Sequence, residues 1–165
     1  MQNASFGVKI KAQELYNING KDDVEFIIKT NIGEEYKELS KIASGGEMSR
    51  IMLAIKTVLA DVDEVKVLVF DEIDTGISGK AAKAVAEKMK IISKKHQTIC
   101  ITHQATIAAK GNSNYYIYKE VENEKTKTNI RKLNEEETIY EIARISNGDI
   151  TKIAIENAKE LRKVG

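Results

Sequence analysis

The alternation of hydrophobic and polar positions predicts two strands near the start of the chain. In FGVKIK (residues 6–11) every second residue is hydrophobic, and in VEFIIKTNI (residues 24–32) the alternate positions carry Val24, Phe26, Ile28, Thr30 and Ile32. This period of two is typical of strands that are buried on one face only. The segment Asn-Gly-Lys-Asp at 19–22 carries turn signals and is expected to join the two strands.

The middle of the chain changes to a helical period and then to continuous hydrophobic runs. After two glycines at 45 and 46, hydrophobic residues recur at helical spacing: Met48, Ile51, Met52, Ile55, Val58 and Leu59. The run at 65–70 and the segment TICIT at 98–102 are each expected to form a strand covered on both faces. Between them, Ser78 is expected to open a helix with one hydrophobic side, formed by Ile77, Ala81, Val85, Met89 and Ile92. Strand, helix and strand in this order predict an α/β fold with a largely parallel sheet and crossover helices.

The last third of the chain predicts an antiparallel region followed by two helices. Two strand-like segments, NYYIYKEV and TNIRKL, flank the polar ENEK and predict a hairpin. Asn134 with Glu137 three residues later has the pattern of a capping box, and a last helix is expected from about 151 to 163. Without a linker, a repeat or any proline, residues 1–165 are interpreted as a single domain.

Charge and composition exclude some classes of protein. The 26 basic and 25 acidic residues nearly cancel, which argues against a strongly basic surface for nucleic acid. The single cysteine, Cys100, excludes an intramolecular disulfide and suits a reducing compartment. No membrane span or secretory signal is evident in the sequence. We therefore expect a soluble cytoplasmic protein with no membrane partner.

Acidic residues and a histidine follow the two predicted central strands. Asp71, Glu72 and Asp74 come directly after the first strand, and His103 follows the second. In parallel sheets, the carboxyl ends of the strands are where binding and chemistry gather. A purely structural alternative is that Asp71 caps the next turn and Glu72 is simply solvated.

The stretch KIASGGEMSR places Ser44, Gly45 and Gly46 at the predicted N-terminus of a helix. One glycine would be enough for a turn. Two glycines and a hydroxyl beside the positive end of a helix indicate that an anion approaches the backbone there.

Taken in order, these motifs resemble the second half of an ABC-type ATPase head. ASGGE is similar to the signature motif, VLVFDE to the Walker B strand, DTGIS to the D-loop that follows, and His103 to the switch histidine. Within that superfamily, KIASGGEMSRIMLAIK and FDEIDTGISGKAA most resemble the SMC-like RecN family of bacterial DNA-repair proteins. EFIIKTNIGEEYKEL and EIARISNGDITKIAIENAKEL support the same resemblance less specifically, and together it spans about residues 8–161.

The resemblance implies an ATP-hydrolysing head and a role for each motif residue. Asp71 would hold Mg²⁺, through a water, Glu72 would act as general base toward the attacking water, and His103 would contact the γ-phosphate region. The signature loop would bind the ATP held by a second head. It consists of Ser44, Gly45, Gly46 and Glu47. Asp74 and Gly76 would lie at the seam of that ATP-dependent homodimer.

The resemblance also implies that part of the head is missing from these residues. No G-x-x-x-x-G-K-[ST] phosphate loop occurs among them. We therefore expect the chain to be the C-terminal lobe of a longer protein and to pair with an N-terminal Walker A lobe. We expect contact with DNA through the full-length protein, and no ATPase activity of the chain alone. Three features depart from common patterns. Ala43 stands where many ABC signatures have leucine, and Glu47 stands where transporters have glutamine. After His103, the residues Gln-Ala-Thr replace those usual in RecN.

Two other classes of function stay open from the sequence. One is a head lobe of another SMC or ABC-class protein, and the other is an interaction module of the same fold that does not hydrolyse ATP. Several other conspicuous residues are interpreted as structural: Cys100 as a buried strand residue, His96 as a solvated helix-end residue, Tyr115, Tyr116 and Tyr118 as strand packing, and Lys152, Lys159, Arg162 and Lys163 as a solvated helix face.

Overall fold

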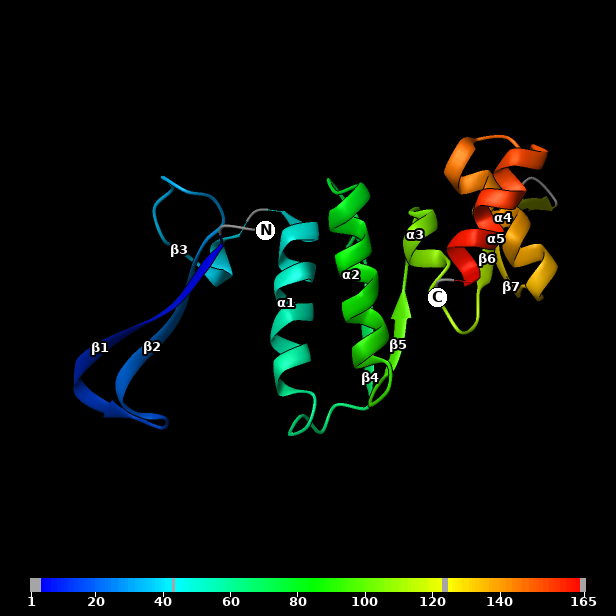
Figure 1. Cartoon of the computed structure of the whole chain (residues 1–165). Helices are drawn as coiled ribbons and strands as arrows, with labels where there is room; N and C mark the ends of the chain where they lie inside the picture. The colour runs from blue at the N-terminus through cyan, green and yellow to red at the C-terminus, as the bar shows by residue number, and fades with distance from the viewer. Residues whose placement is uncertain (1–3, 43, 123–124, 164–165) are drawn as a thin grey trace.

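The computed structural model describes residues 4–42, 44–122 and 125–163. The chain forms an elongated row of three parts (Figure 1). A long hairpin lies at one end, two helices and a small parallel sheet occupy the middle, and a second hairpin with two helices lies at the other end.

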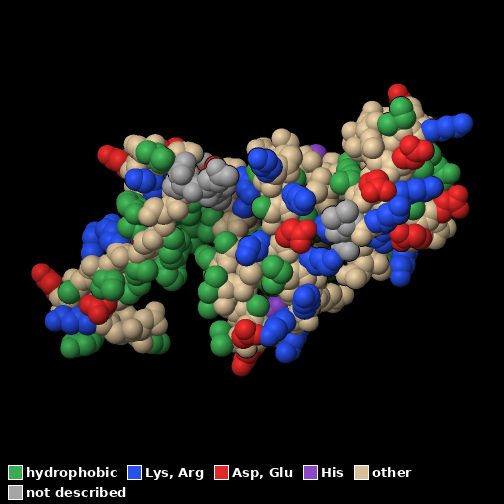
Figure 2. Space-filling view, viewed as in Figure 1, with side chains coloured by type: hydrophobic (Ala, Val, Ile, Leu, Met, Phe, Trp, Pro, Cys, Tyr) green, Lys and Arg blue, Asp and Glu red, His purple; other side chains and the backbone are tan. Residues whose placement is uncertain are grey.

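The first part is an antiparallel sheet. Strand β1 (Ser5–Asn17) pairs with β2 (Gly20–Lys29), and the short β3 (Lys37–Glu38) adds to β2 before a turn of 3-10 helix at Leu39–Lys41. Because Phe6 pairs with Ile28 and Val8 with Phe26, the hydrophobic residues fall on one face, as the alternation predicts. Most of that face is open: Phe6, Val8, Ile10, Val24 and Phe26 are all about half exposed or more. Figure 2 shows hydrophobic side chains gathered along this hairpin.

The middle part is built from α1 (Gly45–Leu59), β4 (Val67–Phe70), α2 (Gly79–Ile92) and β5 (Gln97–Cys100). Strands β4 and β5 pair in parallel, with Phe70 opposite Cys100, and α2 is the crossover between them. One hydrophobic cluster joins these elements: Leu53, Leu68, Phe70, Ile73, Val85, Ala86, Met89, Ile92 and Ile107. In α1 the buried hydrophobic side chains are Ile51 and Leu53, whereas Val58, expected on the buried side, is 82% exposed.

The prediction that both central strands are covered on both faces is wrong. Leu68 and Phe70 are buried against the helices, but Val67, Val69, Ile99 and Ile101 are 44–62% exposed. The continuous hydrophobic run therefore packs on one side only in this chain. An exposed aliphatic sheet face of this kind is typical of a surface that packs against another protein segment.

The third part confirms the hairpin and both helices. It contains β6 (Tyr115–Glu122), β7 (Lys125–Lys132), α4 (Glu135–Asn147) and α5 (Lys152–Lys163), preceded by a short α3 (Ala105–Ala108) that the sequence did not predict. The capping box is present: Asn134 accepts the Glu137 N–H, and Glu137 accepts the Asn134 N–H. A second cluster of small and aliphatic side chains holds α3, α4 and α5 together.

The fold is therefore α/β, as predicted, with one parallel pair and two antiparallel sheets among the described residues. No helix in those residues is long and apolar enough to cross a membrane.

Candidate functional site

The parallel pairing of β4 and β5 brings the predicted acids and the histidine to one edge of the sheet. Asp71 and Glu72 follow Phe70 directly, and His103 follows β5 after two further residues. The Ile101 N–H donates to Phe70 O at 3.0 Å, so the two chain segments leave the sheet side by side. Asp71, Glu72 and His103 are all exposed there.

Glu72 has an unusual backbone conformation. Its φ is 57°, and it is the one non-glycine residue with positive φ among the described residues. The turn is closed by the Thr75 N–H, which donates to Glu72 O at 3.0 Å, and by the Glu72 N–H, which donates to Asp71 Oδ1 at 2.9 Å. A bulky residue held in the left-handed region is strained, and such strain concentrates at functional sites.

The glycine loop begins α1, as the sequence predicts. Ser44 is the N-cap, and its Oγ accepts the Glu47 N–H at 3.4 Å; Ala43 lies outside the described residues. Neither Gly45 nor Gly46 has positive φ, so neither is required by a left-handed turn. A methyl group at Gly46 would come within 2.8 Å of Glu72 O, and one at Gly45 within 2.5 Å of Glu72 Oε2.

Two side chains of α1 tie the glycine loop to the segment after β4. Ser49 Oγ donates to Asp71 O at 2.7 Å. Arg50 Nη1 donates to Ile73 O at 3.1 Å and to Thr75 O at 2.8 Å. The sequence analysis missed both residues, although their place one turn after the glycines, on the side of Gly46, was a usable signal.

Asp74 and Gly76 differ sharply in exposure. Gly76 is exposed with φ 72°, which suits a surface turn. Asp74 is 1% exposed, and its carboxylate faces inward toward Thr102 and His103. The carboxylate of Asp74 is therefore not on the surface of this chain, and the place of Asp74 and Gly76 at a dimer seam stays a prediction.

The residues fit a magnesium site only in part. No group of three or more His, Cys, Asp or Glu side chains that could hold a metal is found in the described part of the chain. Mg²⁺ often uses only one or two carboxylates together with waters and phosphates, and the exposed Asp71 could supply one of these. A hollow of about 180 Å³ lies elsewhere, among residues of β6, β7 and α4, and none of the predicted site residues lines it.

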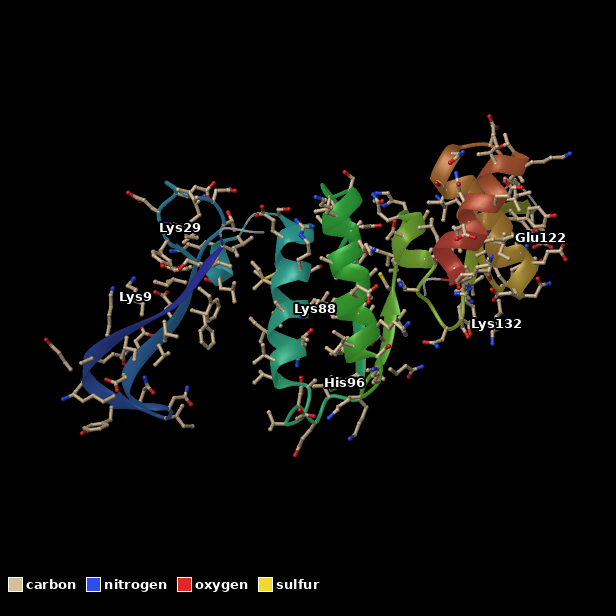
Figure 3. All side chains as sticks on the ribbon, in the orientation of Figure 1. Lys9, Lys29, Lys88, His96, Glu122 and Lys132 are labelled. Carbon is tan, nitrogen blue, oxygen red and sulfur yellow. The ribbon has the colours of Figure 1, made fainter. Side chains whose placement is uncertain are left out.

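The predicted environment is compared with the observed one for two other residues, Cys100 and His96. Cys100 lies in β5, as predicted, and is partly buried; this burial, and then the nearby Asp74 and Asp71 carboxylates, raise the pKa of its thiol to about 12, which disfavours the reactive thiolate. His96 is not solvated, because it is 4% exposed and its Nδ1 lies 2.6 Å from Val65 O. Figure 3 shows it at the amino end of β5, the end opposite His103.

Several polar side chains of β6 and α5 make contacts within the chain. Tyr116 and Tyr118 stack on each other, with ring centroids 5.8 Å apart. Arg162 donates to both carboxylate oxygens of Glu135 and to two backbone carbonyls, those of Ala109 and Gly111. The stacking supports the interpretation of Tyr116 and Tyr118 as strand packing. The prediction that Arg162 is solvated is wrong, because its side chain is only 20% exposed and is bound to α4 and to the loop after α3.

The fold is that of an SMC-type ATPase head. The SMC head with a coiled coil and joint from Pyrococcus yayanosii superposes with a TM-score of 0.60 at 20% identity, covering 87% of this chain and 26% of that one. A chain from a structural study of ATP-driven dimerization and DNA-stimulated activation of SMC ATPases superposes with a TM-score of 0.50 at 21% identity, covering 88% and 84%.

Sequence relatives identify the branch within this class. The chain is 44% identical over 166 residues to the DNA repair protein RecN of Halalkalibacterium halodurans, and 45% identical over 145 residues to that of Bacillus subtilis. These matches cover 98% and 87% of this chain, which is therefore a RecN homologue along nearly its whole length. It spans 29% and 25% of those relatives' own lengths. No family model matches the chain.

Proposed function

We propose that this chain is the signature and Walker B lobe of a RecN-type ATPase head that serves DNA double-strand-break repair and recombination. One observation carries the proposal. The exposed Asp71, Glu72 and His103 leave adjacent parallel strands at one edge, and Ser49 and Arg50 hold the glycine loop against the same segment. Acids, histidine and glycine loop thus form one connected surface.

ATP hydrolysis would use these residues for positioning and charge. Glu72 accepts a proton from the attacking water and orients it, and His103 contacts the γ-phosphate region. Asp71 would hold Mg²⁺, which would supply positive charge beside the phosphates. The strained Glu72 favours this catalytic reading over an interaction module, which has no use for such strain.

The glycine loop would act on ATP bound by a second head. Ser44, Gly45, Gly46 and Glu47 stand at the positive end of the fifteen-residue helix α1, with Gly45 exposed. The dimer would be homodimeric and ATP-dependent, with Gly76 at its seam. The SMC neighbour studied for ATP-driven dimerization supports this arrangement by analogy of fold.

The remainder of the head would come from an N-terminal Walker A lobe. The open faces support this: the aliphatic face of β4 and β5 and the hydrophobic face of the β1–β2 hairpin both need cover. The lobe would contact DNA only as part of the full-length protein, which would be cytoplasmic and would act at the bacterial nucleoid. A head of another SMC or ABC-class protein is the second candidate, but relatives 36–48% identical to this chain and named RecN favour the first.

Calorimetry with Mg-ATP on this chain, beside ATPase assays of the full-length protein, tests the proposal. We expect no binding below millimolar nucleotide for the chain alone, because the phosphate loop supplies most contacts to the β- and γ-phosphates. We expect hydrolysis by the full-length protein. Micromolar affinity of the chain alone would overturn the incomplete-site reading, and a full-length protein without ATPase activity would overturn the function.

A further inference from the structure

Asp74 is a buried carboxylate whose contacts converge on one oxygen. It lies in the turn after β4 with 1% of its surface exposed, among the largest fully buried side chains. Burying a carboxylate is costly unless hydrogen-bond donors surround it. Its hydrogen-bond partners among the described residues come from the loop after β5, so the turn after one strand is tied to the loop after the next.

The contacts join Asp74 Oδ2 to two consecutive residues. Thr102 Oγ1 donates to it at 2.5 Å, and the His103 backbone N–H donates at 2.8 Å. The His103 ring nitrogen Nδ1 lies 3.3 Å from the same oxygen. The Thr102 hydroxyl in turn accepts the Gln104 N–H at 3.0 Å, which fixes the following residue.

A simple link between loops would need only the Thr102 and backbone contacts. The third contact involves the ring. A carboxylate oxygen facing Nδ1 favours a proton on that nitrogen, because the carboxylate can only accept. The His103 side chain is 71% exposed, so its ring is held on one side by a buried anion while the rest faces solvent.

We propose that Asp74 is a positioning residue for His103: it fixes the backbone and ring orientation of the histidine and selects the tautomer with the proton on Nδ1. The claim about the tautomer rests only on contacts within this chain. The consequence for ATP hydrolysis rests on the proposed function. The arrangement resembles other sites in which a buried carboxylate orients an active histidine without reacting itself.

Nitrogen NMR of the imidazole rings of this chain tests the tautomer. The chain has two histidines, so His103→Gln assigns both signals and His96 serves as an internal reference. We expect the neutral His103 ring of the wild type to carry its proton on Nδ1. Asp74→Asn should shift the population toward Nε2–H, because the amide can turn its NH₂ group toward Nδ1. An Nε2–H wild type would overturn the proposal even if no variant folded.

Thr102→Val is the matched control. It removes a different hydrogen bond to the same carboxylate and leaves Asp74 facing the ring. We expect it to lower thermal stability while the His103 tautomer stays unchanged. If Thr102→Val changed the tautomer as Asp74→Asn does, Asp74 would be a loop link only.

ATPase kinetics of the full-length protein separate the two proposals. Asp74→Asn should lower kcat by up to about a hundredfold with KM little changed, since a misplaced group slows chemistry more than binding. Wild-type kcat in a folded Asp74→Asn protein would overturn the positioning role. Absence of ATPase activity in the wild type would overturn the proposed function, while the NMR result would still decide the tautomer.

Discussion

Gly46 lies so close to Thr75 that a methyl group at position 46 would approach Thr75 Cβ to 3.1 Å. The same methyl would meet Glu72 O at 2.8 Å and Arg50 Nη1 at 3.1 Å. Gly46 is buried and Gly45 is exposed, so the two neighbouring glycines serve different purposes. Gly46 lets α1 pack on the turn after β4, and Gly45 leaves the loop's outer surface bare.

Gly46→Ala should therefore destabilise the chain. Backbone must shift to admit the methyl group, and overpacking of this kind costs about 1–3 kcal/mol. Thermal unfolding followed by circular dichroism should show a melting temperature lower by several degrees. Gly45→Ala is the control: its methyl meets only the movable end of the Glu72 side chain, and its melting temperature should hardly change. Equal losses in both variants would contradict the division of roles.

Gly45→Arg should block ATP-driven pairing of heads in the full-length protein without unfolding it. The exposed loop tolerates the change locally, since surface substitutions usually cost within about 0.5 kcal/mol. An arginine side chain would fill the gap through which the partner's phosphate approaches. Size-exclusion chromatography with Mg-ATP measures pairing, and thermal melts of this chain measure folding. Normal pairing of a folded variant would remove the glycine loop from the composite site.

Glu72→Gln in the full-length protein should keep ATP binding and stop hydrolysis. The amide preserves the shape of the side chain and loses the base, and removal of a general base costs about 10²–10⁴ in rate. The variant should accumulate as an ATP-bound dimer. Its control is Glu47→Gln, the same change at a residue that is not proposed to take a proton. Hydrolysis at the wild-type rate by Glu72→Gln would assign the base elsewhere.

Cys100 should react very slowly with iodoacetamide in the folded chain. A pKa of about 12 leaves roughly 10⁻⁴ of the thiol ionised at pH 8, against about a tenth at the ordinary value of 9.0. Unfolding in urea should therefore speed the reaction by roughly a thousandfold. Mass spectrometry follows the reaction, and Cys100 is the only cysteine. Similar rates with and without urea would contradict the raised pKa.

The same pKa shift also fixes the sign of a pH effect on folding. Between pH 9 and 12 the unfolded chain loses the Cys100 proton while the folded chain keeps it. The free energy of unfolding should therefore fall as the pH rises through this window. Cys100→Ala should reduce this decline, and an unchanged decline would show that other groups cause it.

The elements themselves were predictable because their signals are local. The period of two at residues 6–10 and 24–28, and the Asn134–Glu137 capping box, depend on neighbours within a few residues. The strand expected to reach residue 32 ends at Lys29, and Ile32 is 78% exposed. The strand-end position of Asp71, Glu72 and His103 followed from parallel pairing alone.

Contacts between distant segments were not predictable in the same way. The inward turn of Asp74 depends on Thr102 and His103, about 28 residues away. Burial of His96 depends on Val65 O across the sheet. The exposed valines of β4 show a further limit of prediction from sequence. A hydrophobic run indicates that both faces of a strand are suited to burial, but it does not identify the segment that buries them.

The left-handed backbone conformation of Glu72 lowers the stability of the fold at a residue that we propose for catalysis. A side chain in this conformation costs roughly 1–2 kcal/mol, a cost that glycine avoids and asparagine tolerates better. A chain selected only for folding would therefore not keep a glutamate at position 72. Directed evolution of this protein for heat resistance would favour glycine or asparagine there, and each gain in melting temperature at that position would remove the residue that we propose as the base for hydrolysis.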